Sequence, residues 1–127
     1  SGKVFISGIC GDRFAIRNSG AEVVVEGVGN HCSEYMTGGI VVVLGKTGTN
    51  FAAGMSGGVA FIYDYDNSFK NKYNKDMVEL KNVGHEDEIV LKDLITEHLE
   101  STNSIIASSI LKNWNLNLNM FVKVVPK

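Results

Sequence analysis

The strongest constraint on the fold is a repeat with a period of 19 residues, which runs through the first half of the chain. Gly20, Gly39 and Gly58 are separated by this interval, and a short apolar segment follows each of them. The same spacing aligns three columns of residues, which are Val4, Val23, Val42 and Phe61; Phe5, Val24, Val43 and Ile62; and Ile6, Val25, Leu44 and Tyr63. A fixed period of about 20 residues is typical of proteins that are built from stacked repeats.

Each repeat holds one apolar segment and a second, weaker extended segment, such as residues 14–16 or 35–36. A unit like this cannot bury its apolar face alone, whereas stacking pairs equivalent strands in parallel about 4.8 Å apart. A parallel α/β sheet would need helices of ten or more residues between the strands, and no such segment is visible. An antiparallel sandwich is compatible with the periodicity, but it would not repeat the same residue type at the same place in every unit.

The predicted fold class is therefore an all-β solenoid. We expect a right-handed, single-stranded parallel β-helix with about 19 residues per turn over residues 1–64, followed by a short helical C-terminal tail. The right-handed form is favoured because left-handed β-helices are built from six-residue subrepeats, and none is visible here. We assign a structural turn role to six glycines, which are Gly20, Gly27, Gly29, Gly39, Gly48 and Gly58. At Gly39 and Gly58 we expect a positive φ or a close approach of the next turn.

The pair Gly45-Lys46 suggests a phosphate-binding loop, but the spacing argues against one. That motif requires a glycine five residues before the Gly-Lys pair, and the chain has Ile40 there. The intervening valines are strand formers, which cannot curl round an anion. Lys46 aligns with glycines of the preceding repeats, so we interpret it as a solvated turn residue.

The second half of the chain changes character at about residue 64. Residues 65–83 are predicted to form a polar excursion, interpreted as a solvated hairpin. Asp64, Asp66 and Ser68 have the spacing of calcium ligands, but Phe69 stands where a calcium loop needs glycine and Lys75 where it needs glutamate.

Residues 84–127 are predicted to form a helical tail and a final strand. Over residues 87–100 the spacing predicts a helix with one apolar face, made of Leu91, Leu94, Ile95 and His98. The acidic Glu86, Asp87 and Glu88 favour its N-terminus, and His98 is expected to be a hydrogen-bonded core residue. A second helix is predicted to place Ile106, Ile110 and Trp114 on one face, before a strand at residues 120–125. We expect the helices to cap the open end of the β-helix.

Composition excludes several functions. The net charge of −2 gives no electrostatic case for binding nucleic acid or an anionic membrane. The longest apolar run, residues 40–44, is too short to span a bilayer. No signal peptide is visible, and Cys10 and Cys32 fit a reducing compartment, so we expect a cytoplasmic protein. The two cysteines do not follow a metal-binding pattern, and we assign no catalytic, cofactor-binding or metal residue.

Two alternative roles stay open at this point. A small-molecule site would have to draw its polar groups from turn residues such as Asn30, His31 and Glu34. A homo-oligomer could form through the edge strand that contains Val4, which the sequence leaves uncovered. Arg13, Arg17 and Glu34 lie near apolar strands, so they either pair in the interior or face a partner.

Long stretches of the chain resemble a known family. Residues 11–29 (GDRFAIRNSGAEVVVEGVG), 33–64 (SEYMTGGIVVVLGKTGTNFAAGMSGGVAFIYD), 91–104 (LKDLITEHLESTNS) and 121–126 (FVKVVP) resemble the C-terminal glycine-repeat domain of the glutamate synthase large subunit. One departure is that Cys32-Ser33 stands where the family has Gly-Cys before Glu-Tyr-Met. A more distant resemblance is to a subunit of formylmethanofuran dehydrogenase that uses the same repeat.

The resemblance implies a right-handed β-helix that acts as a structural scaffold. It implies a parent enzyme that converts glutamine, 2-oxoglutarate and reducing equivalents to two molecules of glutamate. The domain would pack against the amidotransferase and flavin domains without being catalytic, and the flavin and iron–sulfur cluster would lie in those other parts. The alternative is a stand-alone subunit or interaction module of a related oxidoreductase such as formylmethanofuran dehydrogenase. The electron donor of the parent, a nicotinamide cofactor or ferredoxin, is left open.

Overall fold

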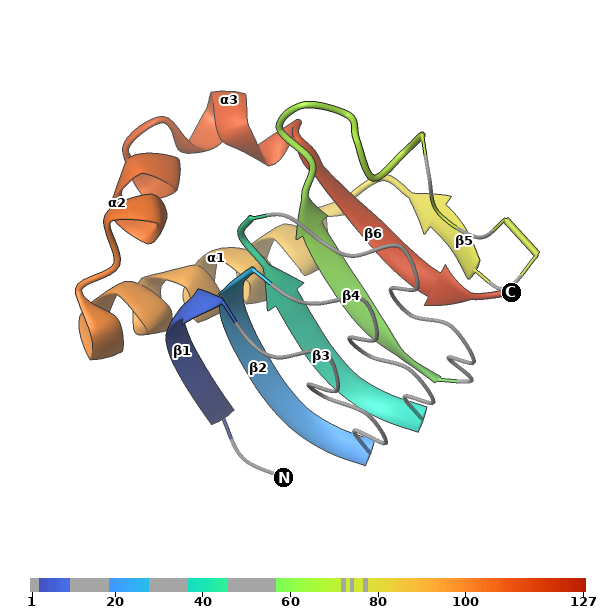
Figure 1. Cartoon of the computed structure of the whole chain (residues 1–127), viewed down its shortest axis with the longest axis horizontal. Coiled ribbons are helices and arrows are strands. Elements are labelled where there is room, and N and C mark those ends of the chain that lie inside the picture. Colours follow the sequence, from blue (N-terminus) through green and yellow to red (C-terminus); the bar gives the residue numbers. More distant parts are fainter. Residues whose placement is uncertain are drawn as a thin grey trace.

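The computed structural model describes residues 3–9, 19–27, 37–45, 57–71, 73, 75–76 and 78–127. These residues form six strands and three helices, which are β1 (Lys3–Ile9), β2 (Ser19–Gly27), β3 (Thr37–Val43), β4 (Gly57–Tyr63), β5 (Val78–Lys81), α1 (His85–Thr102), α2 (Ile105–Lys112), α3 (Trp114–Leu118) and β6 (Phe121–Pro126). All strands belong to one sheet with the order β1-β2-β3-β4-β6-β5 (Figure 1). Strands β1 to β4 are parallel, and β6 runs antiparallel to both β4 and β5.

The predicted all-β solenoid is wrong. The described residues form a mixed α/β fold with one open sheet of parallel and antiparallel strands, and α1 packs along a face of that sheet instead of capping an end. Strand β6 returns beside β4, so the tail of the chain extends the sheet. The physical reason for the error is that a periodic column of apolar residues specifies parallel pairing of neighbouring strands, but it does not specify how the sheet closes. The weaker extended segments predicted at residues 14–16 and 35–36 lie outside the described residues.

The strand register agrees with the predicted columns in two of the three parallel pairs. Val4 lies opposite Val23, and Val42 lies opposite Phe61, as the 19-residue spacing predicts. Between β2 and β3, however, Val24 pairs with Val42 and not with Val43. A register shift between Ser19 and Glu22 places one extra residue on β2, and this irregularity accounts for the difference.

Two of the glycines selected from the repeat have a backbone conformation that side chains rarely adopt. Gly39 has φ 84° and Gly58 has φ 80°, and both lie within strands, β3 and β4, not in turns. Gly39 coincides with the register shift between Thr37 and Ile40. Gly20 and Gly27 belong to β2, whereas Gly29 and Gly48 lie outside the described residues.

We expect Gly58→Ala to lower the free energy of unfolding by about 1–2 kcal/mol, because a Cβ disfavours positive φ. Chemical denaturation of the two proteins measures this difference. The control is Gly84→Ser, since Gly84 has φ −78° and an added Cβ would meet only ordinary contacts there. Equal losses in both variants would contradict the explanation from φ.

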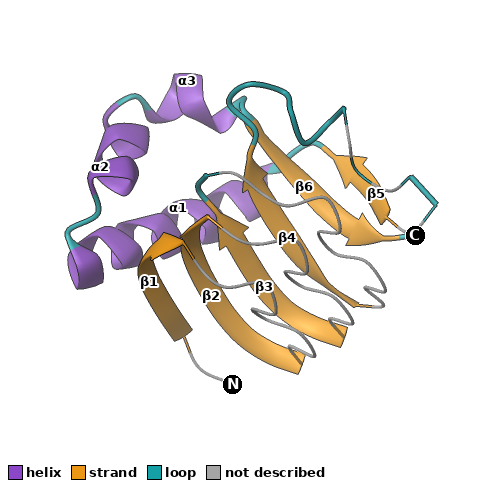
Figure 2. Ribbon diagram, viewed as in Figure 1, coloured by secondary structure: helices purple, strands orange, loops and turns teal. Residues whose placement is uncertain are grey.

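The sheet is buried on both faces, as is typical of parallel sheets. Val24, Val42 and Phe61 face the helices, and Figure 2 shows the helices gathered on one side of the sheet. Their neighbours along the strands point to the opposite face, where Val25, Val43 and other buried residues form a second cluster that includes Phe69. Burial on both faces explains why the strands read as continuous apolar runs.

The helical region follows the predicted order with one correction. Helix α1 buries the four predicted residues, Leu91, Leu94, Ile95 and His98. The predicted second helix is divided at Asn113, so Ile110 and Trp114 belong to α2 and α3 respectively. Ile106 is partly exposed, and Ala107 takes the inward position. The hydroxyl of Ser104 accepts a hydrogen bond from the N–H of Ala107 at 3.1 Å, which begins α2 as a capping residue does.

The predicted polar excursion contains β5, a strand of four residues. Among the described strands β5 pairs with β6 of the tail, and not with a second strand of the excursion as the hairpin interpretation expected. The turn before β5 is fixed by Asp64, a buried carboxylate. One of its oxygens accepts the N–H of Phe69 at 2.9 Å and the other accepts the N–H of Lys70 at 3.1 Å. Asp64 therefore acts as a local backbone anchor that brings the Phe69 ring into the core.

Candidate functional site

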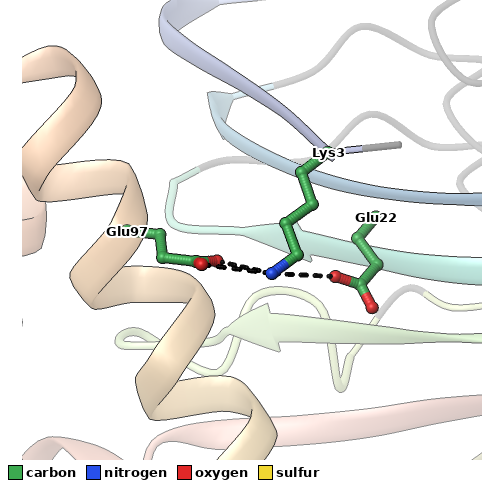
Figure 3. A network of polar contacts seen from close by, with 3 residues as sticks. All are labelled: Lys3, Glu22 and Glu97. Atoms are coloured by element: carbon green, nitrogen blue, oxygen red, sulfur yellow. Dashed lines mark hydrogen bonds and ion pairs between the residues drawn. The ribbon is translucent and has the colours of Figure 1, made fainter.

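Two groups of polar contacts lie along the seam where α1 crosses β1 and β2. Figure 3 shows Lys3 of β1 between Glu97 of α1 and Glu22 of β2. The Lys3 Nζ lies 3.1 Å from each Glu97 carboxylate oxygen and 3.9 Å from Glu22 Oε2. The hydrogen bond and negative charge of Glu97 raise the pKa of Lys3. The Lys3 side chain is 48% exposed, so this network contributes little to the stability of the fold.

A second connection across the seam is buried. The Nε2 of His98 in α1 lies 3.0 Å from Oε2 of Glu26, the residue before the last of β2. His98 is fully buried, and its Nδ1 has no hydrogen-bond partner among the described residues. The centroid of its ring lies 6.1 Å from that of Phe5. Because a carboxylate accepts, the Nε2–H of His98 is the donor. The prediction of a hydrogen-bonded core histidine is confirmed for this nitrogen.

The acidic first turn of α1 makes hydrogen bonds to α3 and β6. Asp87 accepts hydrogen bonds from Lys123 Nζ of β6 at 2.9 Å and from the Gly84 N–H at 3.3 Å. Glu88 accepts the indole N–H of Trp114 in α3 at 3.0 Å. The interpretation of these acids as a helix start is confirmed. Their long-range partners, which join α1 to α3 and β6, were not visible in the sequence.

Tyr63, at the end of β4, links the sheet to α3. Its hydroxyl donates to Oδ1 of Asn117 at 3.0 Å. Burial raises the pKa of Tyr63, and a negative charge on Tyr65 adds to this effect. The folded state therefore keeps the phenol protonated at a pH at which the unfolded chain has lost the proton.

From this shift we expect stability to fall as the pH rises above about 10, the ordinary pKa of tyrosine. Tyr63→Phe should cost about 1 kcal/mol at pH 7 through the lost hydrogen bond. The difference in free energy of unfolding between the variant and the native protein should then become smaller at high pH, because phenylalanine cannot ionise. Denaturation curves at pH 7 and above pH 10 measure both quantities. A gap that stays constant with pH would contradict this reading of Tyr63.

Several residues singled out in the sequence lie outside the described residues. They are Asn30, His31 and Glu34 of the alternative small-molecule site, together with Cys10, Arg13, Arg17, Cys32 and Lys46. Within the described ranges, no three His, Cys, Asp or Glu side chains gather as metal ligands would. In the same part of the chain, no helix is both long and apolar enough to cross a membrane.

Comparison with known proteins agrees with the resemblance seen in the sequence. Residues 1–127 match the family described as GXGXG motif. The chain belongs to the GXGXG family.

Its similar proteins include three glutamate synthases. The chain is 53% identical over 128 residues to glutamate synthase [NADH] of Schizosaccharomyces pombe, with 100% of this chain covered. It is 51% identical over 126 residues to the chloroplastic ferredoxin-dependent glutamate synthase of Spinacia oleracea, with 98% covered. It is 50% identical over 129 residues to the glutamate synthase [NADPH] large chain of Bacillus subtilis, with 100% covered. The GXGXG chain spans only 6% to 8% of the length of these relatives.

Proposed function

We propose that this chain is a non-catalytic structural domain of a glutamate synthase, an enzyme that forms two glutamates from glutamine, 2-oxoglutarate and reductant. One observation carries the proposal. Over 98% to 100% of its own length the chain is 50% to 53% identical to three glutamate synthases, and the match covers only 6% to 8% of their length. Such a fraction is the size of one domain in a long polypeptide, and it leaves the amidotransferase and flavin domains as the parts against which this unit packs.

The electron donors named for the relatives support a role outside the redox chemistry. The three enzymes are named for NADH, ferredoxin and NADPH, and the chain is about equally similar to each. A unit that contacted the donor would be expected to vary with it. We also propose that the flavin and the iron–sulfur cluster of the parent enzyme lie in its other domains.

Contacts between α1 and the sheet favour a scaffold role for this unit. His98 with Glu26 and Asp87 with Lys123 join elements that are distant in the sequence. His98 and Glu26 form the more buried of the two pairs, and removing one member would leave the other without compensation, so this pair favours one relative position of helix and sheet. A unit of fixed shape is suited to holding catalytic domains at a set separation. For the compartment we propose the cytoplasm, although the spinach relative is named as chloroplastic.

A second candidate is an interaction module that acts as a separate subunit. Strand β1 lies at the edge of the sheet and has only β2 as its neighbour among the described strands. An edge strand exposes backbone N–H and C=O groups that can pair with another chain. A solution mass that rises with concentration would favour this homo-oligomeric role, and a constant mass would count against it.

The experiment that tests the proposal compares the native gene product with residues 1–127 alone. Both are given glutamine and 2-oxoglutarate with NADH, NADPH or reduced ferredoxin, and glutamate is measured. We expect a long native polypeptide that forms glutamate with one of the donors, and no glutamate from residues 1–127. Glutamate formed by the short chain alone would overturn the non-catalytic role. A long native polypeptide that forms no glutamate with any of the three donors would overturn the assignment to glutamate synthase.

A further inference from the structure

A groove of about 350 Å³ lies where α1 ends and α2 begins. Leu99 of α1 and Ile105 of α2 contribute its apolar lining, and Ser108, Ser109 and Lys112 contribute polar groups. The four α2 residues are spaced i, i+3, i+4 and i+7, so they share one face of that helix. This is not the core face of α2, which consists of Ala107 and Ile110.

Among the large apolar side chains of the described residues, Ile105 has the largest exposed fraction. It is 86% exposed. A single exposed isoleucine needs no special explanation on a protein surface. Here it borders a concave groove and stands next to Leu99, which is itself only partly buried. The groove therefore offers an apolar contact that the described residues leave unfilled.

The charge of the groove limits what it accepts. Lys112 is the one charged side chain in its lining, and no acidic partner for it is found among the described residues. Ser108 and Ser109 supply hydroxyl groups that can donate or accept hydrogen bonds. An occupant that carries an apolar side chain close to a carboxylate would match these groups.

We infer that the groove receives an extended segment from another part of the same glutamate synthase polypeptide. An apolar side chain of that segment packs against Ile105 and Leu99, and a neighbouring Asp or Glu pairs with Lys112. The inference rests on the proposed function. In the relatives the matched region is 6% to 8% of the length, so most of the polypeptide lies outside this unit and is available to fill the groove.

The test is photo-crosslinking in the full-length native enzyme. Ile105 is replaced by the photoreactive amino acid p-benzoylphenylalanine, and the linked peptides are identified by mass spectrometry. We expect one principal link, to a peptide outside residues 1–127 that contains an apolar residue next to Asp or Glu. The matched control carries the same group at Glu79, an exposed residue of β5, and it should not link to that peptide.

A charge variant makes the result sharper. Lys112→Glu should reduce the yield of the link by about twofold to fivefold, the range expected for one exposed ion pair, and Lys112→Arg should preserve it. The absence of a link, a link only to a second copy, or a link to an unrelated protein would overturn the inference. A yield that does not respond to Lys112→Glu would overturn the pairing with a carboxylate.

The length and glutamate-forming activity of the same preparation separate this inference from the proposed function. A long, active enzyme that gives no link from position 105 would overturn only the occupant of the groove. A short, inactive product would overturn both.

Discussion

Gly45→Ala is expected to lower the free energy of unfolding by about 3 kcal/mol, because there is no room for a methyl group at this position. A Cβ at residue 45 would overlap the carbonyl oxygen of Glu26 and lie 3.1 Å from its carbonyl carbon. Both are backbone atoms, so they cannot move away by side-chain rotation. Nearby, the N–H of Leu44, the residue after β3, donates to the Val25 carbonyl of β2 at 2.9 Å. This hydrogen bond joins the two segments at this point. Relief of the overlap would lengthen that hydrogen bond.

Urea denaturation followed by the fluorescence of Trp114, the single tryptophan of the chain, measures the effect. Gly84→Ser is the control, because the nearest atom to an added Cβ there is Asp87 Oδ2, at 3.6 Å. It should change stability by only a few tenths of a kcal/mol, in the favourable direction, since serine is a better N-cap than glycine. If Gly45→Ala were as mild as the control, the close approach of the two backbones would be refuted.

Phe61→Ala is expected to cost about 3–5 kcal/mol, the usual range for removing a buried aromatic ring. Phe61 is buried on the face of the sheet that α1 covers, in one cluster with Val42, Leu91 and Ile95. Removal of the ring leaves a cavity beneath the helix, so α1 should lose protection from amide hydrogen exchange together with the loss in stability. Denaturation and hydrogen exchange measure the two consequences independently.

The matched control is Tyr65→Ala, which removes an aromatic ring of similar size from an exposed position only four residues away. Its cost should be well below that of Phe61→Ala. Similar costs for the two variants would mean that Phe61 does not seat the helix on the sheet.

The sequence was informative where the signal was local and periodic. The column that contains Val4, Val23 and Phe61 predicted parallel strands with nearly the observed register. The spacing of Leu91, Leu94 and Ile95 predicted α1 and its buried face. In both cases burial requires apolar residues along one face, so the spacing of apolar residues in the sequence predicts the element and its buried face.

The sequence could not show how these elements are assembled. The apolar stripe of α1 fits the end of a solenoid as well as the face of an open sheet, and the return of β6 beside β4 has no local signal. The pairs that form the candidate site are also remote, since Lys3 and Glu97 are 94 residues apart and Glu26 and His98 are 72 apart. A single sequence contains no information that identifies such partners before the fold is known.

The position of α1 across the first strands also has a consequence for synthesis of the protein. On the ribosome, strands β1 to β4 emerge before the helix that covers Val24, Val42 and Phe61. Contacts that join residues so far apart in the chain form slowly. Until they form, the apolar surface of the strands is exposed and prone to aggregate. Translation must therefore reach α1 before the nascent strands can bury this face.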